Sequence, residues 1–476
     1  MDNLGKKIAG YWRSNAVAYS TIVLVVFIGY ASVFFYSLSI AHTHGVSTTH
    51  FLTFSEGDAH EYYVLGHVLH DTGRFSLTAT SSPEYFRTPG YPLFIAVILS
   101  IFKNDLAVPL AQIVLVALSA LCLFALGEKI FSRGVGVVAT ILYILNPMTI
   151  TQSFRTTTET LFVCVLIGAV FVLMRKEPTR RATVAGGALL GFLALVRPIG
   201  LFIIPLFLLW IVLVYRKRWN VMIRHGLLFM LGVAMVLLPW LYRNEVYARH
   251  FSLSSISTYN MLFYNVLEFE HQRTGISKDI LHAQMVQRIG SSDTDQQFRS
   301  FAYTEAEQQA VKEYLTPHLV QYGVFHLYTT IPFLFGSDFE DAQRSLHLQG
   351  VLPGDPIVDV NLSALLRQGQ LHSFISTISL NPLALIERIG WMLLLLSSFC
   401  MVSILVSTRS KKSLLVLFLF ALPLLLALLT GPVSSPRYRM PAAPFLIMLG
   451  VAGIHFLVGY WRNRSAQRIV NTTPVV

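Results

Sequence analysis

Residues 19–40 read YSTIVLVVFIGYASVFFYSLSI and contain no charged side chain. A helix needs about 20 mostly apolar residues to cross the hydrocarbon core of a bilayer, so this run predicts a membrane-spanning helix. No small-residue cleavage site follows it, and we therefore expect a retained anchor rather than a signal peptide. The whole chain has the same character, since 54% of its 476 residues are hydrophobic and only 13% are charged. In a soluble protein about a quarter of all residues are charged, so this composition excludes a soluble enzyme.

Further apolar runs follow, which gives ten candidate spans. They lie near residues 19–40, 105–126, 134–150, 158–174, 183–198, 199–215, 225–241, 389–406, 413–430 and 441–460. Another apolar run, 91–102, is predicted to lie along the outer membrane face as an interfacial helix, because an eleventh span would reverse the side of every later loop. With ten spans, the inner loops and tails hold nineteen basic and three acidic residues, as the positive-inside rule requires. The formal charge of +11 is thus explained by topology rather than by a nucleic-acid site, and both termini are predicted to be cytoplasmic.

The expected fold class is an all-α polytopic membrane protein with about ten transmembrane helices and amphipathic helices on the outer face after the first span. Residues 1–241 form a membrane core that includes the first outer loop, 41–104. We expect residues 242–388 to form an outer segment, with a helix around 304–322, that serves either as a lid or scaffold or in partner selection, and residues 389–476 to hold the last transmembrane helices and a cytoplasmic tail. A bacterial inner membrane fits this compact chain, although a glycosylation sequon at 361–363 keeps an endoplasmic reticulum location open.

The unusual polar residues collect at the outer ends of the spans, and almost none lies at mid-span, where a transporter would need them. After the first span, the pattern from Asp58 to Leu69 predicts a short amphipathic helix that ends at Gly73. Asp58 is either only a helix cap or a carboxylate held at the membrane edge as general base or acid. Glu159 starts the fourth span on the same predicted side. It is either a helix-start carboxylate favoured by the dipole or a partner of Asp58 in acid–base chemistry.

Arginines also occur on the outer side, against the positive-inside trend. Arg87 lies in a rigid turn of proline and glycine before the interfacial helix, and Arg197 lies in the short turn between the fifth and sixth spans. Arg437 and Arg439 flank Tyr438 before the last span. Arginine can bind phosphate through two parallel hydrogen bonds, so these residues are candidates for an anionic ligand. Membrane anchoring is the alternative for Arg87.

Histidines crowd the first outer segment, where His67 and His70 are spaced as i, i+3. No pair has tight zinc spacing with cysteine, so a solvated histidine face is the preferred interpretation. No cofactor is predicted, and the requirement for a divalent metal stays open. The three cysteines, Cys122, Cys164 and Cys400, all fall inside expected spans, which argues against a disulfide framework.

Taken together, these residues resemble the motifs of the C-type membrane glycosyltransferases, near the protein O-mannosyltransferases and the lipid A aminoarabinose transferases. In chain order the motifs are Gly57-Asp58 with Tyr62-Tyr63, Arg87-Thr88-Pro89-Gly90-Tyr91-Pro92, Asn146-Pro147, Glu159-Thr160, Arg197-Pro198, Pro239-Trp240 with Arg243-Asn244, and Arg437-Tyr438-Arg439 with Pro441. They follow the family order over about 1–250, with a last match near 437–441. The chain departs from the O-mannosyltransferases in having His60 between Asp58 and Glu61 rather than an adjacent acidic pair, which weakens the case for a protein acceptor.

The resemblance implies a glycosyltransferase whose catalytic part is the membrane core. It would move a sugar from a polyprenyl-phosphate donor to a lipid, glycan or protein acceptor on the outer, periplasmic face, with inversion at the anomeric carbon. Asp58 and Glu159 would be the catalytic carboxylates. The donor phosphate would be bound by Arg87, Arg197, Arg437 and Arg439 beside Tyr438, and the further substrate-lining candidates are Glu61, Tyr62, Tyr63, Tyr91, Arg155, Arg243 and Asn244. Two alternatives stay open: a polyprenyl-diphosphate glycan polymerase or ligase, and a non-enzymatic lipid-linked sugar transporter or flippase.

Overall fold

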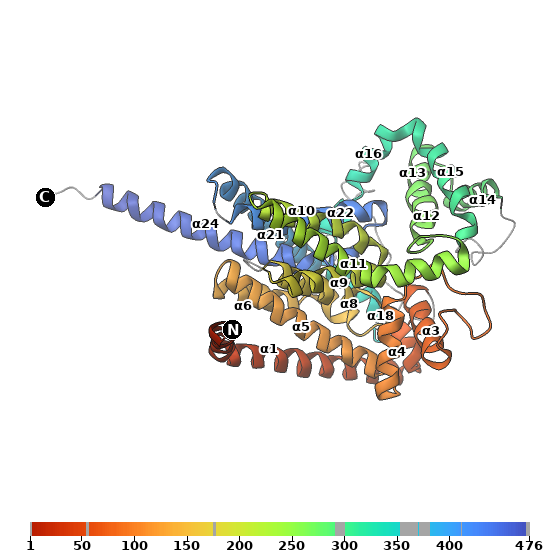
Figure 1. The fold of residues 1–476 in the computed structure, drawn as a ribbon, viewed down its shortest axis with the longest axis horizontal. Coiled ribbons are helices and arrows are strands. Elements are labelled where there is room, and N and C mark those ends of the chain that lie inside the picture. Colours follow the sequence, from red (N-terminus) through yellow and green to blue (C-terminus); the bar gives the residue numbers. More distant parts are fainter. Residues whose placement is uncertain are drawn as a thin grey trace.

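The computed structural model describes residues 2–53, 57–174, 178–290, 300–352, 370, 381–410 and 412–472, with side chains from residue 16 to residue 460 of these ranges. Within them every regular element is a helix (Figure 1), so the all-helical class is confirmed. The sequon at 361–363 lies outside the described residues.

Among the described residues, ten helices run largely along one direction and form a bundle, with the start of α1 and the end of α24 at the same end (Figure 1). They are α1 (Asp2–Thr43), α5 (Ala107–Ile130), α6 (Arg133–Ile144), α8 (Glu159–Leu173), α9 (Arg180–Val196), α10 (Ile204–Tyr215), α11 (Trp219–Ala248), α21 (Pro382–Ser407), α22 (Ser413–Thr430) and α24 (Ala443–Thr472). We call the end of the bundle away from the termini the distal end. It corresponds to the side predicted to be the outer one.

Seven segments of the described chain are long and apolar enough to cross a membrane. These are Ala16–Thr43, Ala107–Ile130, Pro198–Tyr215, Trp219–Ala248, Pro382–Ser407, Ser413–Val433 and Ala443–Tyr460. The chain is therefore a multi-pass membrane protein, but the predicted number of ten spans is not confirmed. The expected spans 134–150, 158–174 and 183–198 form shorter helices. The first of them breaks because Asn146 caps a new helix, α7 (Pro147–Gln152), through a hydrogen bond from the Thr149 N–H at 3.0 Å.

The segment after the first span forms the expected helix, α3 (Gly57–Thr72), preceded by α2 (Thr48–Thr53). It ends at Gly73, whose φ of 68° is the left-handed conformation that glycine adopts at low cost. The apolar run before the second span forms α4 (Gly90–Phe102), which lies across the bundle at its distal end (Figure 1). Its surface position in a membrane stays a prediction.

A second group of helices extends from the distal end (Figure 1). It consists of α12 (Ile256–Asn260), the π-helical turn η2 (Met261–Val266), α13 (Leu267–Thr274), α14 (Lys278–Arg288), α15 (Thr304–Leu315) and α16 (Leu319–Tyr328), and we call it the distal module. Its apolar core, which includes Phe269 and Phe325, is separate from the core of the bundle. A single helix was expected around 304–322. The chain instead divides there into α15 and α16 through a 3-10 turn, η4 (Thr316–His318), at Pro317, because proline disturbs a continuing helix.

Two short helices, α17 (Ile331–Phe335) and α18 (Asp338–Leu348), lead from the distal module back to the bundle, where α18 packs on α7 and α21. A last short helix, α23 (Pro436–Arg439), follows the 3-10 turn η5 (Gly431–Val433) and precedes α24. The predicted division of the chain into three regions stays a prediction.

Candidate active site

The first turn of α3 places two carboxylates at the distal end of the bundle. Gly57 begins the helix with φ of 69°, and Asp58 and Glu61 are one turn apart, so they share a face of α3. Tyr62, the next residue, is buried with the core instead. The sequence pattern had predicted both the helix and this position of Asp58.

The turn before α4 delivers Arg87 to these carboxylates. Glu84 organises the turn because its side chain accepts hydrogen bonds from the backbone N–H groups of Phe86 and Arg87, at 2.6 and 3.1 Å. Gly90 then lets the chain pass very close to the end of α9, since a Cβ there would lie 2.6 Å from the Leu195 carbonyl carbon. This close approach brings the turn beside Arg197, the residue that follows α9.

Three further residues reach the same place from other elements. Glu159 is the first residue of α8, and its side chain is completely buried. Arg197 has an extended backbone between α9 and the 3-10 helix η1 (Pro198–Ile203). Arg437 comes from the short helix α23, far along the chain. Helix starts and turns at the distal ends of the bundle helices therefore supply the whole group.

These side chains form one continuous chain of ion pairs, which we call the ion cluster. Its members in order are Glu61, Arg87, Asp58, Arg437, Glu159 and Arg197. Arg87 donates to Glu61 Oε2 and to Asp58 Oδ1, both at 2.6 Å. Arg437 donates to Asp58 Oδ2 at 3.4 Å through Nη2 and to Glu159 Oε1 at 2.5 Å through Nε. Arg197 Nη1 donates to the same Glu159 oxygen at 3.0 Å.

The charges of the ion cluster balance, with three guanidiniums against three carboxylates. Burial raises the pKa of Asp58, but Arg87 and Arg437 outweigh it and hold that pKa well below its usual range. Asp58 is therefore an anion at neutral pH. Its side chain is 35% exposed, against 0% for Glu159, which makes Asp58 the more accessible of the two predicted catalytic carboxylates.

Several predicted lining residues border the ion cluster. The Arg87 guanidinium lies over the Tyr62 ring at 5.2 Å, and Tyr62 packs edge-on against Tyr91, whose centroid is 5.5 Å away. The Tyr438 ring lies 5.3 Å from the Arg197 guanidinium. Arg155 is a buried neighbour, and burial, with Arg437 adding to it, lowers its pKa to about 9.

Other predicted residues make their contacts elsewhere. Tyr63 donates to Asp105 Oδ2 at 2.6 Å. Arg243 supports the turn before α4 by donating to the Glu84 carbonyl oxygen at 2.9 Å, and Asn244 Nδ2 donates to the Ser252 carbonyl oxygen at 2.8 Å. These hydrogen bonds join residues outside the ion cluster and stabilise the fold around it.

Arg439 has contacts of its own, which do not include the ion cluster. Its Nη2 donates to Asp338 Oδ1 at 2.8 Å, and the guanidinium lies 4.1 Å from the centre of the Trp391 ring. The remaining acceptors are the carbonyl oxygens of Phe333, Leu334 and Gly336. Because the side chain is completely buried and already hydrogen-bonded, we treat it below as a structural residue rather than a phosphate ligand.

Sequence reasoning missed Asp338, the acidic partner of Arg439, and Glu387, which lies beside it. Asp338 is buried at the start of α18 and also accepts from Asn146 Nδ2 at 2.6 Å. Burial raises the pKa of Asp338 to about 6, although Arg439 opposes the rise. Glu387 caps the same helix by accepting from the Asp338 and Phe339 N–H groups at 2.9 and 3.0 Å. A serine followed three residues later by an acid, as in Ser337 and Glu340, marks this helix start in the sequence.

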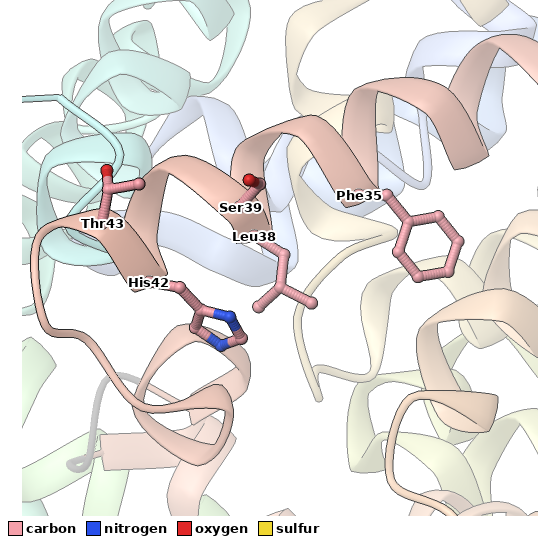
Figure 2. Close-up of a pocket in the computed structure, with 5 residues that line it drawn as sticks. All are labelled: Phe35, Leu38, Ser39, His42 and Thr43. Carbon is pink, nitrogen blue, oxygen red and sulfur yellow. The ribbon is translucent and has the colours of Figure 1, made fainter.

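Two further features lie outside the ion cluster, the histidines of the first outer segment and a surface recess. In the part of the chain with described side chains, no group of three or more His, Cys, Asp or Glu residues is placed to hold a metal ion. His67 instead lies 3.0 Å from Asp105 Oδ1. A surface recess of about 450 Å³ lies on the distal half of α1, lined by Phe35, Leu38, Ser39, His42 and Thr43 (Figure 2). The recess includes no member of the ion cluster.

Comparison with known proteins agrees with the motifs. Residues 86–242 match the family described as dolichyl-phosphate-mannose-protein mannosyltransferase. The matched stretch contains Arg87, Glu159 and Arg197. The resemblance to the C-type membrane glycosyltransferases is thereby confirmed, and the chain is similar to transferases of this kind. No curated protein matches the chain by sequence.

Solved structures of low sequence identity also match the chain. ArnT from Cupriavidus metallidurans bound to undecaprenyl phosphate is 12% identical with a TM-score of 0.39, and 92% of this chain and 77% of that chain are covered. The same protein in the apo state is 13% identical with a TM-score of 0.38, over 94% and 77%. An oligosaccharyltransferase of Archaeoglobus fulgidus tethered with an acceptor peptide is 10% identical with a TM-score of 0.44, over 88% of this chain and 49% of that chain.

Proposed function

We propose that this protein transfers a sugar from a polyprenyl-phosphate donor to an acceptor at the distal face of the membrane, with inversion at the anomeric carbon. The proposed face is periplasmic, in a bacterial inner membrane, because the positive-inside rule puts the basic loops and both termini in the cytoplasm. The family matched by residues 86–242 is described by a dolichyl-phosphate sugar, which is a donor of this class.

The observation that carries the proposal is the bridge that Arg437 makes between Asp58 and Glu159. Three guanidiniums meet there where bundle helices end, at the level where the phosphate of a lipid carrier would lie. A phosphate that leaves with the electrons of a broken glycosidic bond gains negative charge as the bond breaks. Guanidiniums that already hold the bound phosphate stabilise that charge more strongly than water does, because they need no further reorganisation as the bond breaks.

The charge balance of the ion cluster suggests how substrate binding and base strength are coupled. An arriving phosphate competes with the carboxylates for Arg87 and Arg437. As these guanidiniums turn to the phosphate, the pKa of Asp58 rises towards its ordinary value, and the carboxylate becomes a better base. Asp58 then accepts the proton of an acceptor hydroxyl while that oxygen attacks the anomeric carbon. The new glycosidic bond forms, the bond to the phosphate oxygen breaks, and the lipid phosphate leaves with the electron pair.

The remaining roles follow from the same geometry. Glu159 holds Arg197 and Arg437 in place from a fully buried position, so we assign it to orienting the guanidiniums rather than to proton transfer. Glu61 does the same for Arg87. The acceptor class, lipid, glycan or protein, is left to experiment.

The test is turnover of a polyprenyl-phosphate sugar by purified protein in lipid vesicles. We expect sugar release or transfer by the unmodified chain, and a loss of about 100-fold or more in Asp58→Asn, since general base catalysis contributes about that factor. Asp71→Asn is the matched control because Asp71 lies on the same helix and is exposed. Full activity of a folded Asp58→Asn variant would overturn the role of Asp58.

Two experiments separate the alternatives. Passage of the lipid-linked sugar across sealed vesicles without bond cleavage would mean a flippase. Lost polymer length in the lipid-linked glycans of a deletion strain would mean a polymerase or ligase, whereas a lost single sugar supports the transferase.

A further inference from the structure

Helix α16 of the distal module carries a stripe of apolar side chains that no described residue covers. Val320 is 82% exposed, Val324 is 60% exposed and Leu327 is 59% exposed. Their spacing of four and three residues puts them on one face of the helix. Such a stripe is costly in water and is unusual on a soluble surface, so it indicates a partner.

The opposite side of α16 packs inward, which fixes the direction in which the stripe faces. Phe325 is buried, and its ring centroid lies 5.3 Å from that of Phe269 in the core of the distal module. The third side is tied to the bundle, because His326 Nε2 donates to the Leu428 carbonyl oxygen at 2.6 Å near the end of α22. Gly431 allows this contact, since a Cβ there would lie 2.3 Å from the His326 ring.

The stripe adjoins the apolar surface of segments that are long enough to cross a membrane, and lipid is the neighbour of such a surface. Helix α22 is one of the apolar segments long enough to cross a membrane, and Leu424 and Leu428 are exposed on it. Leu24 on α1, another such segment, is 60% exposed, in the range of the α16 stripe. In Figure 1, α16 rises from the distal end of the bundle, on the opposite edge from α4. The apolar surface of the spans therefore continues onto α16 at the distal end of the bundle.

We propose that α16 rests on the phospholipid surface at the distal end of the bundle, with Val320, Val324 and Leu327 in the boundary between headgroups and acyl chains. A helix with one apolar face lies in the plane of the interface in this way. The consequence is that the distal module is held against the leaflet next to the ion cluster. This proposal does not depend on the proposed sugar transfer, because it concerns only the bilayer.

The test uses spin labels on the full-length chain in phosphatidylcholine vesicles. Val324→Cys and the matched control Ile280→Cys are made in a background in which Cys122, Cys164 and Cys400 are alanine. Ile280 is also an exposed apolar residue of the distal module, but it lies on α14, farther from the bundle (Figure 1). We expect the label at Val324 to be accessible to oxygen and shielded from a water-soluble nickel complex, and the label at Ile280 to show the reverse.

Two outcomes would overturn the proposal. One is aqueous accessibility at both positions. The other is a Val324 label broadened by a second copy of the chain, which would make the stripe a protein interface. If the cysteine-free background fails to fold, hydrogen exchange of the unmodified chain decides. Residues 319–328 should then exchange several-fold more slowly in phospholipid nanodiscs than in detergent, while residues 278–288 should be unchanged. Equal exchange of residues 319–328 in both media would refute the contact with lipid.

Discussion

Replacing Glu159 by glutamine removes a carboxylate that two arginines share. Both Arg197 and Arg437 donate to its Oε1 atom, and its side chain has no exposure to solvent. Glutamine has nearly the same shape and keeps an acceptor oxygen, so the change isolates the charge.

The expected loss in the free energy of unfolding follows from the burial of the Glu159 side chain. Removing one partner of a buried ion pair typically costs about 3–5 kcal/mol, because the remaining charge is left without compensation. Here Arg197 and Arg437 keep 17% and 21% exposure, and Arg437 keeps its second pair with Asp58, so part of the loss is recovered. We expect Glu159→Gln to lower the free energy of unfolding by about 3 kcal/mol, at the lower end of that range.

The assay is equilibrium unfolding of the purified protein in mixed micelles, followed by circular dichroism. Glu313→Gln is the control, since Glu313 pairs with Arg288 on the exposed surface of the distal module. Exposed pairs are screened by water, so this variant should unfold like the unmodified chain. A loss smaller than about 1 kcal/mol in Glu159→Gln would mean that the buried carboxyl is neutral and unpaired, contrary to this prediction.

Three further predictions concern the packing of Gly90, the structural role of Arg439 and the protonation of Glu307 in the distal module. Gly90→Ala should destabilise the fold by about 1–3 kcal/mol and reduce turnover, because the added Cβ meets the end of α9. The control Gly168→Ala has nothing within 4 Å of its added Cβ and lies inside α8, where alanine is the better helix former, so it should not lower the midpoint of thermal unfolding. Arg439→Lys should lower the free energy of unfolding by about 3 kcal/mol, since a buried lysine cannot keep the forked hydrogen bonds, and an unchanged melting curve would contradict the structural role. Burial raises the pKa of Glu307 to about 7, so the folded chain holds this proton more tightly than the unfolded chain. The stability that the protonated Glu307 contributes is fully present below about pH 4.3 and is lost as the pH rises through about 7. Glu307→Gln should therefore stabilise the protein by on the order of 2 kcal/mol at pH 8 and by much less at pH 4. An equal effect at both pH values would contradict this prediction.

The parts of this structure that sequence could predict are those with a local pattern. The membrane class follows from apolar runs, and helix α3 with its end at Gly73 follows from periodicity and a glycine stop. The break of the expected helix 304–322 at Pro317 is also visible in the sequence once the proline is given its weight.

The acidic residue with which each arginine pairs could not be predicted, because these ion pairs join residues that are far apart in the chain. Arg437 and Arg439 are two positions apart on α23, so their side chains leave the helix on nearly opposite sides. One reaches Asp58 and Glu159, and the other reaches Asp338. Their sequence context is the same, and only the packing of α18 against the bundle distinguishes a candidate ligand from a structural arginine.

The proposed binding of a lipid-carrier phosphate by the ion cluster can be measured as the affinity of the purified protein for polyprenyl phosphate in nanodiscs. A charge-assisted hydrogen bond is worth about 1.5–3 kcal/mol, so Arg437→Gln should weaken binding at least about tenfold. Arg249→Gln, which changes an exposed arginine at the distal end of α11, should bind like the unmodified chain. Unchanged affinity in a folded Arg437→Gln variant would mean that the ion cluster does not bind this phosphate.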